Sequence, residues 1–170
     1  MLHHHVLVVG DNYVGKTSLC LRLAMDLPPS SSYMSTLNFD SFFARIGPTH
    51  SITLYDMPGH SRFHRHAETR YANCDVVILM GRGRHIDDTW FERVSAWAPL
   101  ASWLVVSRSS SDGWRTYARQ RHLTYCQLDI HGDMDNFIQA LVRQCSLHAA
   151  RPVPVQLQDT PDEQYLSYCT

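Results

Sequence analysis

Apolar and polar positions alternate along the chain in a way that predicts strands and helices in turn. Short apolar, β-branched runs predict buried strands, and apolar residues at helical spacing predict amphipathic helices. The predicted strands are residues 4–9, 39–46, 51–55, 75–80, 102–106 and 123–128. The predicted helices are residues 16–25, 88–98, 114–121 and 133–148, with Asp87 or Asp88 capping the second of them.

This alternation predicts an α/β fold with a mostly parallel sheet and helices on both faces. Gly47-Pro48 joins two of the strands as an antiparallel hairpin, and residues 107–113 form a serine-rich loop. We expect one domain over residues 1–148 and a flexible Pro- and Gln-rich tail over residues 149–170. In such sheets, ligands bind at the carboxyl ends of the strands.

A phosphate-binding loop stands between the first predicted strand and the first predicted helix. It has the pattern Gly10-x-x-x-x-Gly15-Lys16-Thr17. Its glycines let consecutive backbone N–H groups approach one phosphate chain, and the following helix points its positive end at the same anion. Lys16 can reach the terminal phosphates, and the Thr17 hydroxyl can bind Mg²⁺. The strand-to-helix context argues against a chance glycine loop.

Composition excludes several classes of function. The net charge is −1 with no block of basic residues, which argues against a nucleic-acid surface and a polybasic membrane anchor. The five cysteines include no C-x-x-C pair, so we expect reduced thiols in a cytoplasmic chain, most of them in the core. The histidines at 3–5 are too few for a tag or metal site, and we expect them at a strand edge.

Several separate stretches within residues 6–106 resemble small GTPases of the Ras superfamily, and most closely its Rab branch. The phosphate-binding loop resembles the Rab loop GDSGVGKS with two changes, and residues 33–40 (YMSTLNFD) resemble the first switch. The stretch Asp56-x-x-Gly59-His60-Ser61-Arg62-Phe63 falls where the family has DTAGQERF. The segment Phe91–Trp97 (FERVSAW) matches the family signature of the third helix.

The resemblance implies a P-loop NTPase fold of the small-GTPase type, with six strands, five of them parallel, and five helices. It implies binding of GTP or GDP with Mg²⁺, the metal being held by Thr17, Thr36 and Asp56. The expected phosphate contacts come from the phosphate-binding loop and the two switches: Asn12, Tyr13, Val14, Gly15, Lys16, Thr17, Ser18, Thr36 and Gly59.

The resemblance also implies a molecular switch that acts through protein partners. The switch loops, residues 27–42 and 56–71, would be held by the terminal phosphate and would contact an effector or regulator, by analogy in vesicle trafficking. The end Ser-Tyr-Cys-Thr is no prenylation signal, so we expect no stable lipid anchor. We therefore expect a cytoplasmic protein that reaches membranes peripherally through its partners.

His60 stands where the family has the glutamine that orients the attacking water. Translational GTPases use histidine after a similar Asp-x-Pro-Gly, so His60 is the catalytic candidate, and an exposed switch histidine is the alternative. Asn12 and Tyr13 replace small residues near the phosphates, which predicts slow hydrolysis. The spacing of His60, His64 and His66 fits no standard zinc ligand set, and a surface patch is the expected alternative.

Guanine recognition is where the chain departs from the family. The family pattern N-K-x-D is replaced by Ser-Arg-Ser-Ser at residues 107–110, so the carboxylate that pairs with guanine is missing. The candidate base contacts are Ser107, Arg108, Asp112 and Ile130. An arginine can stack on a base, whereas Asp112 is two residues late. We expect weaker and less selective nucleotide binding.

Three readings follow. The first is a small GTPase switch with slow hydrolysis. The second is a pseudo-GTPase, an interaction module that keeps the fold without cycling, which the altered base region and Tyr13 favour. The third is a nucleoside triphosphatase with relaxed base specificity. The retained set of Lys16, Thr17, Thr36 and Asp56 favours the first and third.

Overall fold

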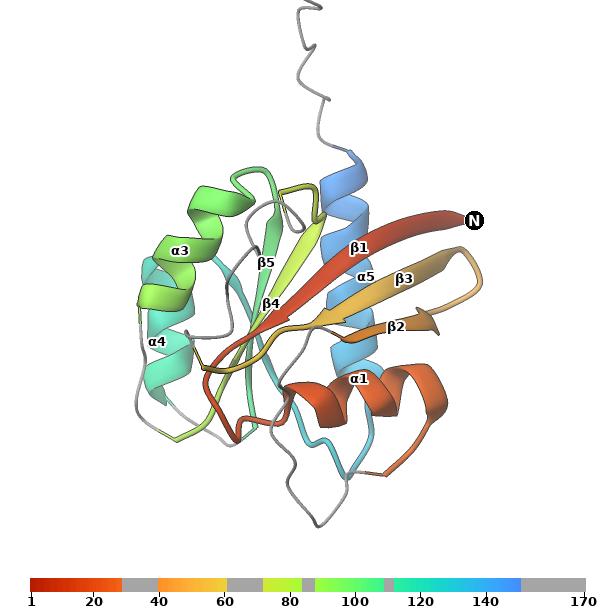
Figure 1. Cartoon of the computed structure of the whole chain (residues 1–170), viewed down its shortest axis with the longest axis horizontal. Helices are drawn as coiled ribbons and strands as arrows, with labels where there is room; N and C mark the ends of the chain where they lie inside the picture. Colours follow the sequence, from red (N-terminus) through yellow and green to blue (C-terminus); the bar gives the residue numbers. More distant parts are fainter. Residues whose placement is uncertain (29–39, 61–71, 84–87, 109–111, 151–170) are drawn as a thin grey trace, which may run out of the picture.

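The sheet has six strands in the order β2-β3-β1-β4-β5-β6. The computed structural model describes residues 1–28, 40–60, 72–83, 88–108 and 112–150. The strands are β1 (Leu2–Val9), β2 (Asp40–Arg45), β3 (His50–Asp56), β4 (Val76–Gly81), β5 (Ser102–Ser107) and β6 (Thr124–Gln127). Only β2 runs antiparallel, against β3 (Figure 1). The predicted fold class and the hairpin are therefore confirmed.

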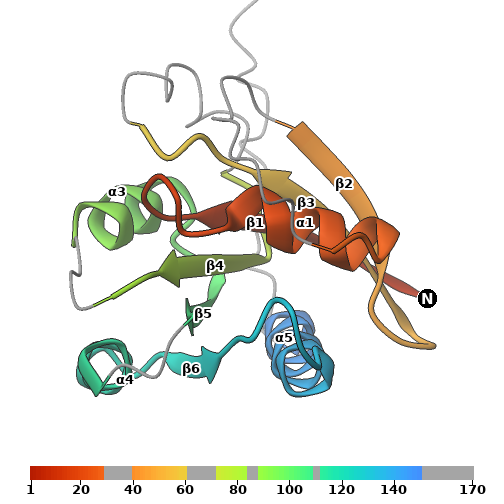
Figure 2. The same cartoon turned by 90° about the horizontal axis from the view of Figure 1, so that it is seen from below.

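Helices cover both faces of this sheet (Figure 2). The described helices are α1 (Lys16–Met25), α3 (Thr89–Trp97), α4 (Asp112–Gln120) and α5 (Asp135–Ala149). Successive side chains of a strand point to opposite faces. Val6 and Val8 accordingly pack in the core under α1 and α5, and Leu7 and Val9 pack in the core under α3 and α4. Burial on both faces explains the continuous apolar run of β1.

Two local predictions differ from the structure. The serine-rich loop does not extend to residue 113, because α4 already begins at Asp112. Asp88 occupies the cap position of α3, as predicted, but its side chain makes no capping hydrogen bond, and the alternative Asp87 lies outside the described residues. The Asp88 carboxylate instead pairs with Arg121, with 2.6 Å between Oδ1 and Nη2. The Asp88 carboxylate thus contacts a residue distant in sequence and makes no capping hydrogen bond. No local sequence pattern indicates this ion pair.

Asp75 ties the amino-terminal half of β1 to the end of α5. Its Oδ2 accepts the His5 backbone N–H at 2.7 Å, and its Oδ1 lies 3.0 Å from His148 Nε2. His4 lies beside it, with 3.9 Å between Nδ1 and the same carboxylate, and stacks on His50. Burial lowers the pKa of His4, with the neighbouring histidines adding to the effect and Asp75 opposing it. This group of residues, the Asp75 cluster, lies beside the amino-terminal half of β1 and joins it to β3, to the start of β4 and to α5.

The histidine segment lies on β1, which runs between β3 and β4 in the sheet. Its residues 2–5 pair in register with β3 alone, because pairing with β4 begins at Val6, and this agrees with the predicted position at a strand edge. His3 and His5 reach across to hydroxyl groups on β3, at 3.0 Å for Ser51 and 2.9 Å for Tyr55. The segment therefore stabilises the projecting part of the sheet.

The predicted core position of the cysteines is confirmed for the four that the structure describes. Cys20, Cys74, Cys126 and Cys145 are buried and carry free thiols, whereas Cys169 lies outside the described residues. Burial raises the pKa of Cys74 and Cys145 to about 12, so these thiols stay protonated.

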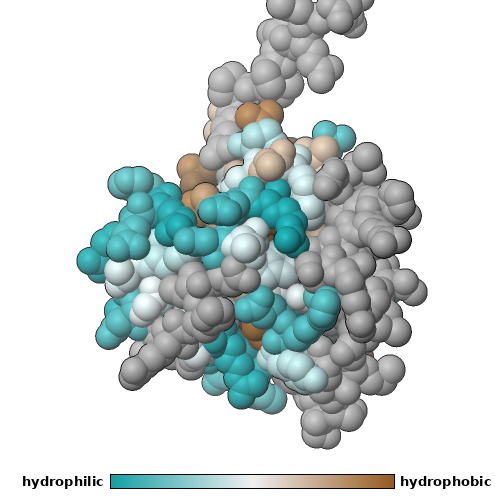
Figure 3. Space-filling view, turned by 60° about the vertical axis from the view of Figure 1, so that its left-hand side comes forward, coloured by the Kyte–Doolittle hydropathy of each residue, from teal (hydrophilic) through white to brown (hydrophobic). Residues whose placement is uncertain are grey.

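None of the described helices is long and apolar enough to cross a bilayer. The face turned forward in Figure 3, on the side of α3 and α4, is mostly hydrophilic.

Candidate functional site

The phosphate-binding loop joins the carboxyl end of β1 to α1. Gly10 has a φ of 139°, Tyr13 of 65° and Gly15 of 97°, so the backbone turns repeatedly through conformations that side chains disfavour. A Cβ on Gly10 would lie 2.2 Å from the Met80 carbonyl oxygen on β4. No side chain caps α1 at Gly15. The arrangement places a tight loop directly before a helix amino terminus, which suits an anion.

Lys16 is held inside this loop. Its side chain is buried, and Nζ donates to the main-chain oxygens of Gly10 and Asp11 at 2.8 Å each. Burial lowers the pKa of Lys16 to about 8, while the carboxylates of Asp56 and Asp11 oppose the shift. The loop therefore positions a cation whose charge is poorly solvated, and a phosphate placed beside it would be strongly attracted.

Thr17 and Asp56 meet at the ends of two different elements. The Thr17 hydroxyl donates to Asp56 Oδ2 at 2.5 Å, and Asp56 is fully buried at the end of β3. A hydroxyl and a carboxylate are oxygen donors of the kind Mg²⁺ prefers. The structure thus brings together two of the three predicted metal ligands. The third, Thr36, lies outside the described residues.

Gly59 packs directly on the phosphate-binding loop. A Cβ at Gly59 would lie 2.6 Å from both the backbone nitrogen and the Oδ1 atom of Asn12. This contact brings the second switch segment to the loop at a distance that only glycine allows. Asn12, Tyr13 and His60 are exposed around the contact. His64 and His66 lie outside the described residues, as does most of each predicted switch.

Arg108 lies over the last glycine of the loop. A Cβ on Gly15 would lie 3.1 Å from the Arg108 Nη1 atom, so the guanidinium group lies against the end of the phosphate-binding loop. The other candidate base contacts are less favourably placed. Ser107 is fully buried at the end of β5, and the Ile130 side chain belongs to the core, so only its backbone could reach a ligand. Asp112 is the exposed first residue of α4.

The remaining predicted phosphate contacts are divided between the core and the surface. Val14 packs its side chain in the core, so only its backbone N–H faces a ligand, and Ser18 is half-buried in the first turn of α1.

Asp11 was not predicted to have a role, yet its Oδ1 accepts a hydrogen bond from Trp90 Nε1 on α3 at 2.9 Å. The two residues are 79 positions apart in sequence, so no local pattern indicates the contact.

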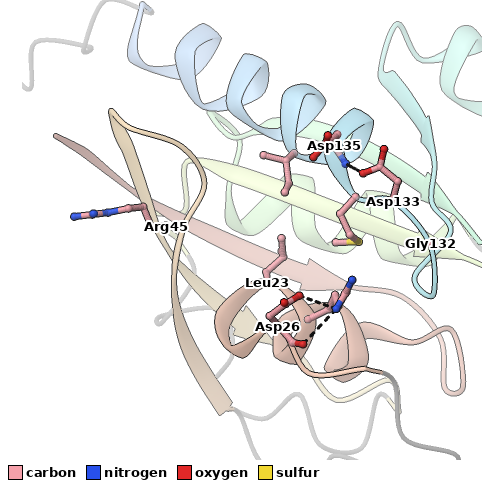
Figure 4. Close-up of a pocket in the computed structure, with 9 residues that line it drawn as sticks. Leu23, Asp26, Arg45, Gly132, Asp133 and Asp135 are labelled. Atoms are coloured by element: carbon pink, nitrogen blue, oxygen red, sulfur yellow. Dashed lines mark hydrogen bonds and ion pairs between the residues drawn. The ribbon is translucent and has the colours of Figure 1, made fainter.

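A separate cavity of about 330 Å³ lies between α1, β2 and the start of α5. Charged residues of both signs line it, but the ligands predicted for phosphate and metal do not. Figure 4 shows that Arg45 points away from the other labelled residues, while the dashed lines join Asp26 to Arg22 and Asp133 to the backbone of Asp135. Because Arg22 is already paired with Asp26 and Arg45 points away, we do not assign this cavity as a second phosphate site.

Replacing Tyr13 by glycine is expected to raise the free energy of unfolding by about 1 kcal/mol, because the native φ is then unstrained. The measurement is the midpoint of urea unfolding. Tyr13→Ala is the control, since alanine keeps the Cβ and most of the backbone strain. An equal gain in both variants would show that the exposed ring, and not the backbone, is responsible.

Comparison with known proteins finds a matching family model and several relatives with a similar sequence. Residues 5–110 match the family model described as Ras of Complex, Roc, domain of DAPkinase. The chain is 30% identical to Ras-related protein Rab-1 of Theileria annulata over 102 residues, covering 55% of this chain and 46% of that protein. It is 29% identical to GTP-binding protein RHO4 of Saccharomyces cerevisiae over 118 residues, covering 64% of this chain and 40% of that protein. The chain thus spans less than half the length of these relatives.

Proposed function

Because the chain belongs to the Roc family of GTPase domains in the Ras superfamily, we propose that it binds GTP and GDP with Mg²⁺ and acts as a nucleotide-dependent switch. The buried Lys16 at the turn of the loop is the observation that supports this most strongly. Its ammonium group lies within the loop that precedes α1, whose amino end attracts phosphate. Thr17 and Asp56 would hold the metal, which would neutralise charge on the terminal phosphates.

The test is to purify the protein without added nucleotide, denature it, and identify what it releases by chromatography. We expect GDP or GTP close to one equivalent per chain. Lys16→Ala is the matched control and is expected to release little, since it loses the cation together with its two hydrogen bonds to the loop. Release of no nucleotide, together with no binding of added GTP and Mg²⁺, would leave the pseudo-GTPase as the better account.

Relaxed base selectivity is the second function we consider. Its support is Arg108, whose guanidinium lies over Gly15 and can stack on any base, combined with the absence of a carboxylate at residue 110. We propose discrimination between GTP and ATP that is smaller than a carboxylate pair would give. Competition of GTP and ATP for the same site measures it. Strong rejection of ATP would mean that other groups recognise guanine.

Slow hydrolysis belongs to the same proposal. The Asn12 side chain lies against Gly59, so a polar group occupies space next to the residue expected to contact the terminal phosphate. His60 is exposed, and as the catalytic residue it would orient the attacking water. Single-turnover release of phosphate measures the rate, and Asn12→Gly is expected to increase it. A rate in the wild type equal to that of an activated GTPase would contradict the proposal.

We propose further that a protein effector or regulator binds through the two switch loops, and that the protein acts in the cytoplasm and reaches membranes through such partners. The support is the similarity to Rab and Rho proteins. Affinity capture with the protein loaded with GDP or with a non-hydrolysable GTP analogue is the test. A partner enriched only with the GTP analogue is expected. Partners that ignore the nucleotide would favour the pseudo-GTPase.

Nucleotide affinity is expected to fall as pH rises above about 8, by up to tenfold per pH unit. The lowered pKa of Lys16 means that the nucleotide-free chain loses this proton near pH 8, whereas a bound phosphate retains it. Binding therefore takes up a proton above that pH. Titration with a fluorescent GDP analogue between pH 7 and 9.5 measures the effect. Lys16→Arg is the control and should give a flat profile, because arginine stays charged.

A further inference from the structure

We propose that Trp90 is a positioning residue for the phosphate-binding loop: it holds the Asp11 carboxylate on the α3 side of the loop and keeps it from competing with phosphate for Lys16. The inference rests on the proposed nucleotide binding and extends it to a residue of another helix. Trp90 Nε1 donates to Asp11 Oδ1 at 2.9 Å. Lys16 Nζ meets the same residue only through the main-chain oxygen, at 2.8 Å.

Asp11 therefore has two polar groups that serve two different partners. Its carbonyl oxygen orients the lysine, and its carboxylate faces the indole. The carboxylate is nevertheless close enough to Lys16 to oppose the lowering of its pKa. A carboxylate that moved onto the ammonium group would form a strong charged hydrogen bond and would have to be displaced by every incoming phosphate.

Core packing holds the Trp90 indole in one position, so that its hydrogen bond keeps the Asp11 carboxylate away from Lys16. Trp90 is 5% exposed and packs in the core with Leu7, Val9 and Met57, which belong to β1 and the segment after β3. The Arg93 guanidinium lies over its ring at 5.9 Å. Because the ring cannot follow the carboxylate, the hydrogen bond fixes where the carboxylate lies.

The experiment compares two Trp→Phe variants in the same core. Trp114 offers the matched control, since it is equally buried and its Nε1 also donates one hydrogen bond, to the Gly83 oxygen at 3.1 Å, away from the loop. Affinity for a fluorescent GDP analogue is expected to fall about tenfold in Trp90→Phe and to change less than about twofold in Trp114→Phe. Urea unfolding of both variants checks that they are folded.

Removing the charge of Asp11 distinguishes a positioning role of the Trp90 hydrogen bond from a role of Trp90 in core packing. In the Trp90→Phe background, Asp11→Asn is expected to restore affinity to that of Asp11→Asn alone, because an amide cannot compete with phosphate. If Trp90→Phe and the double variant Trp90→Phe/Asp11→Asn bind the GDP analogue equally weakly, the role of Trp90 is merely structural and the inference is overturned. Wild-type affinity in Trp90→Phe would overturn it as well.

A second route leaves Trp90 in place. Asp11→Glu lengthens the side chain so that its carboxylate passes the indole, and affinity is expected to fall, whereas Asp11→Asn keeps it. Equal affinity of these two variants would overturn the inference even if Trp90→Phe fails to fold. If the wild type itself binds neither GDP nor GTP, the proposed function fails first and the inference falls with it.

Discussion

Gly10→Ala is expected to destabilise the fold by about 4 kcal/mol, close to the whole stability of many domains. The new Cβ would lie 2.2 Å from the Met80 carbonyl oxygen, well inside contact distance. Relief would require β1 and β4 to separate at the centre of the sheet, where Val9 pairs with Leu79. The positive φ of 139° adds backbone strain. Urea unfolding, followed by circular dichroism, measures the loss.

Gly47→Ala is the matched control for this variant. Gly47 has nearly the same φ, 133°, but a Cβ there would meet nothing within 4 Å. The control should therefore show the backbone cost alone, about 1–2 kcal/mol. If both glycine variants lose the same free energy, the contact with Met80 contributes nothing and the explanation is wrong.

Asp75→Ala is expected to lower the free energy of unfolding by about 3 kcal/mol. The substitution removes the acceptor of the His5 backbone N–H and of His148, and it leaves both donors in a partly buried place. The end of α5 would then lose a polar attachment to the sheet. Thermal or urea unfolding measures the global loss, and hydrogen exchange should show the larger local effect at the end of α5.

Two further variants test whether Asp75 acts through these bonds. Asp75→Asn keeps an acceptor oxygen and is expected to lose about 1 kcal/mol. Asp88→Ala removes a carboxylate of similar size from the exposed pair with Arg121 and is expected to cost less than about 1 kcal/mol. A loss in Asp88→Ala as large as in Asp75→Ala would mean that burial and the two donors do not matter.

The order of elements and the phosphate-binding loop could be predicted because their signals are local. The run Val6–Val9 is apolar because both faces of β1 are buried, and the glycines that follow it are needed for the positive φ values of the turn. Thr17 could be proposed because the loop pattern places it at the start of α1, after the loop that leaves the carboxyl end of β1, and the family resemblance supplied Asp56, at the carboxyl end of β3. Parallel strands bring such ends together.

Both differences between the predicted and the observed helix ends involve contacts between residues distant in sequence. The Asp88 cap and the extent of the loop before α4 were predicted from neighbouring residues, but the Asp88 carboxylate pairs with Arg121, and Trp114 of α4 packs against Gly81. These partners are brought close by the sheet and not by the local sequence. Local propensity is weak compared with tertiary contacts, so it is overruled where such contacts exist.

The sequence by itself therefore determined the strand and helix pattern, the Gly10–Thr17 loop and the chemistry that this loop allows, because spacing along a few residues specifies them. Only the tertiary structure decided that Lys16 is buried on two carbonyl oxygens, that Arg108 covers Gly15, and that Trp90 holds Asp11. Each of the last two contacts joins residues at least 79 positions apart. Contacts at such separations depend on how strands and helices pack together, and packing is a property of the whole chain.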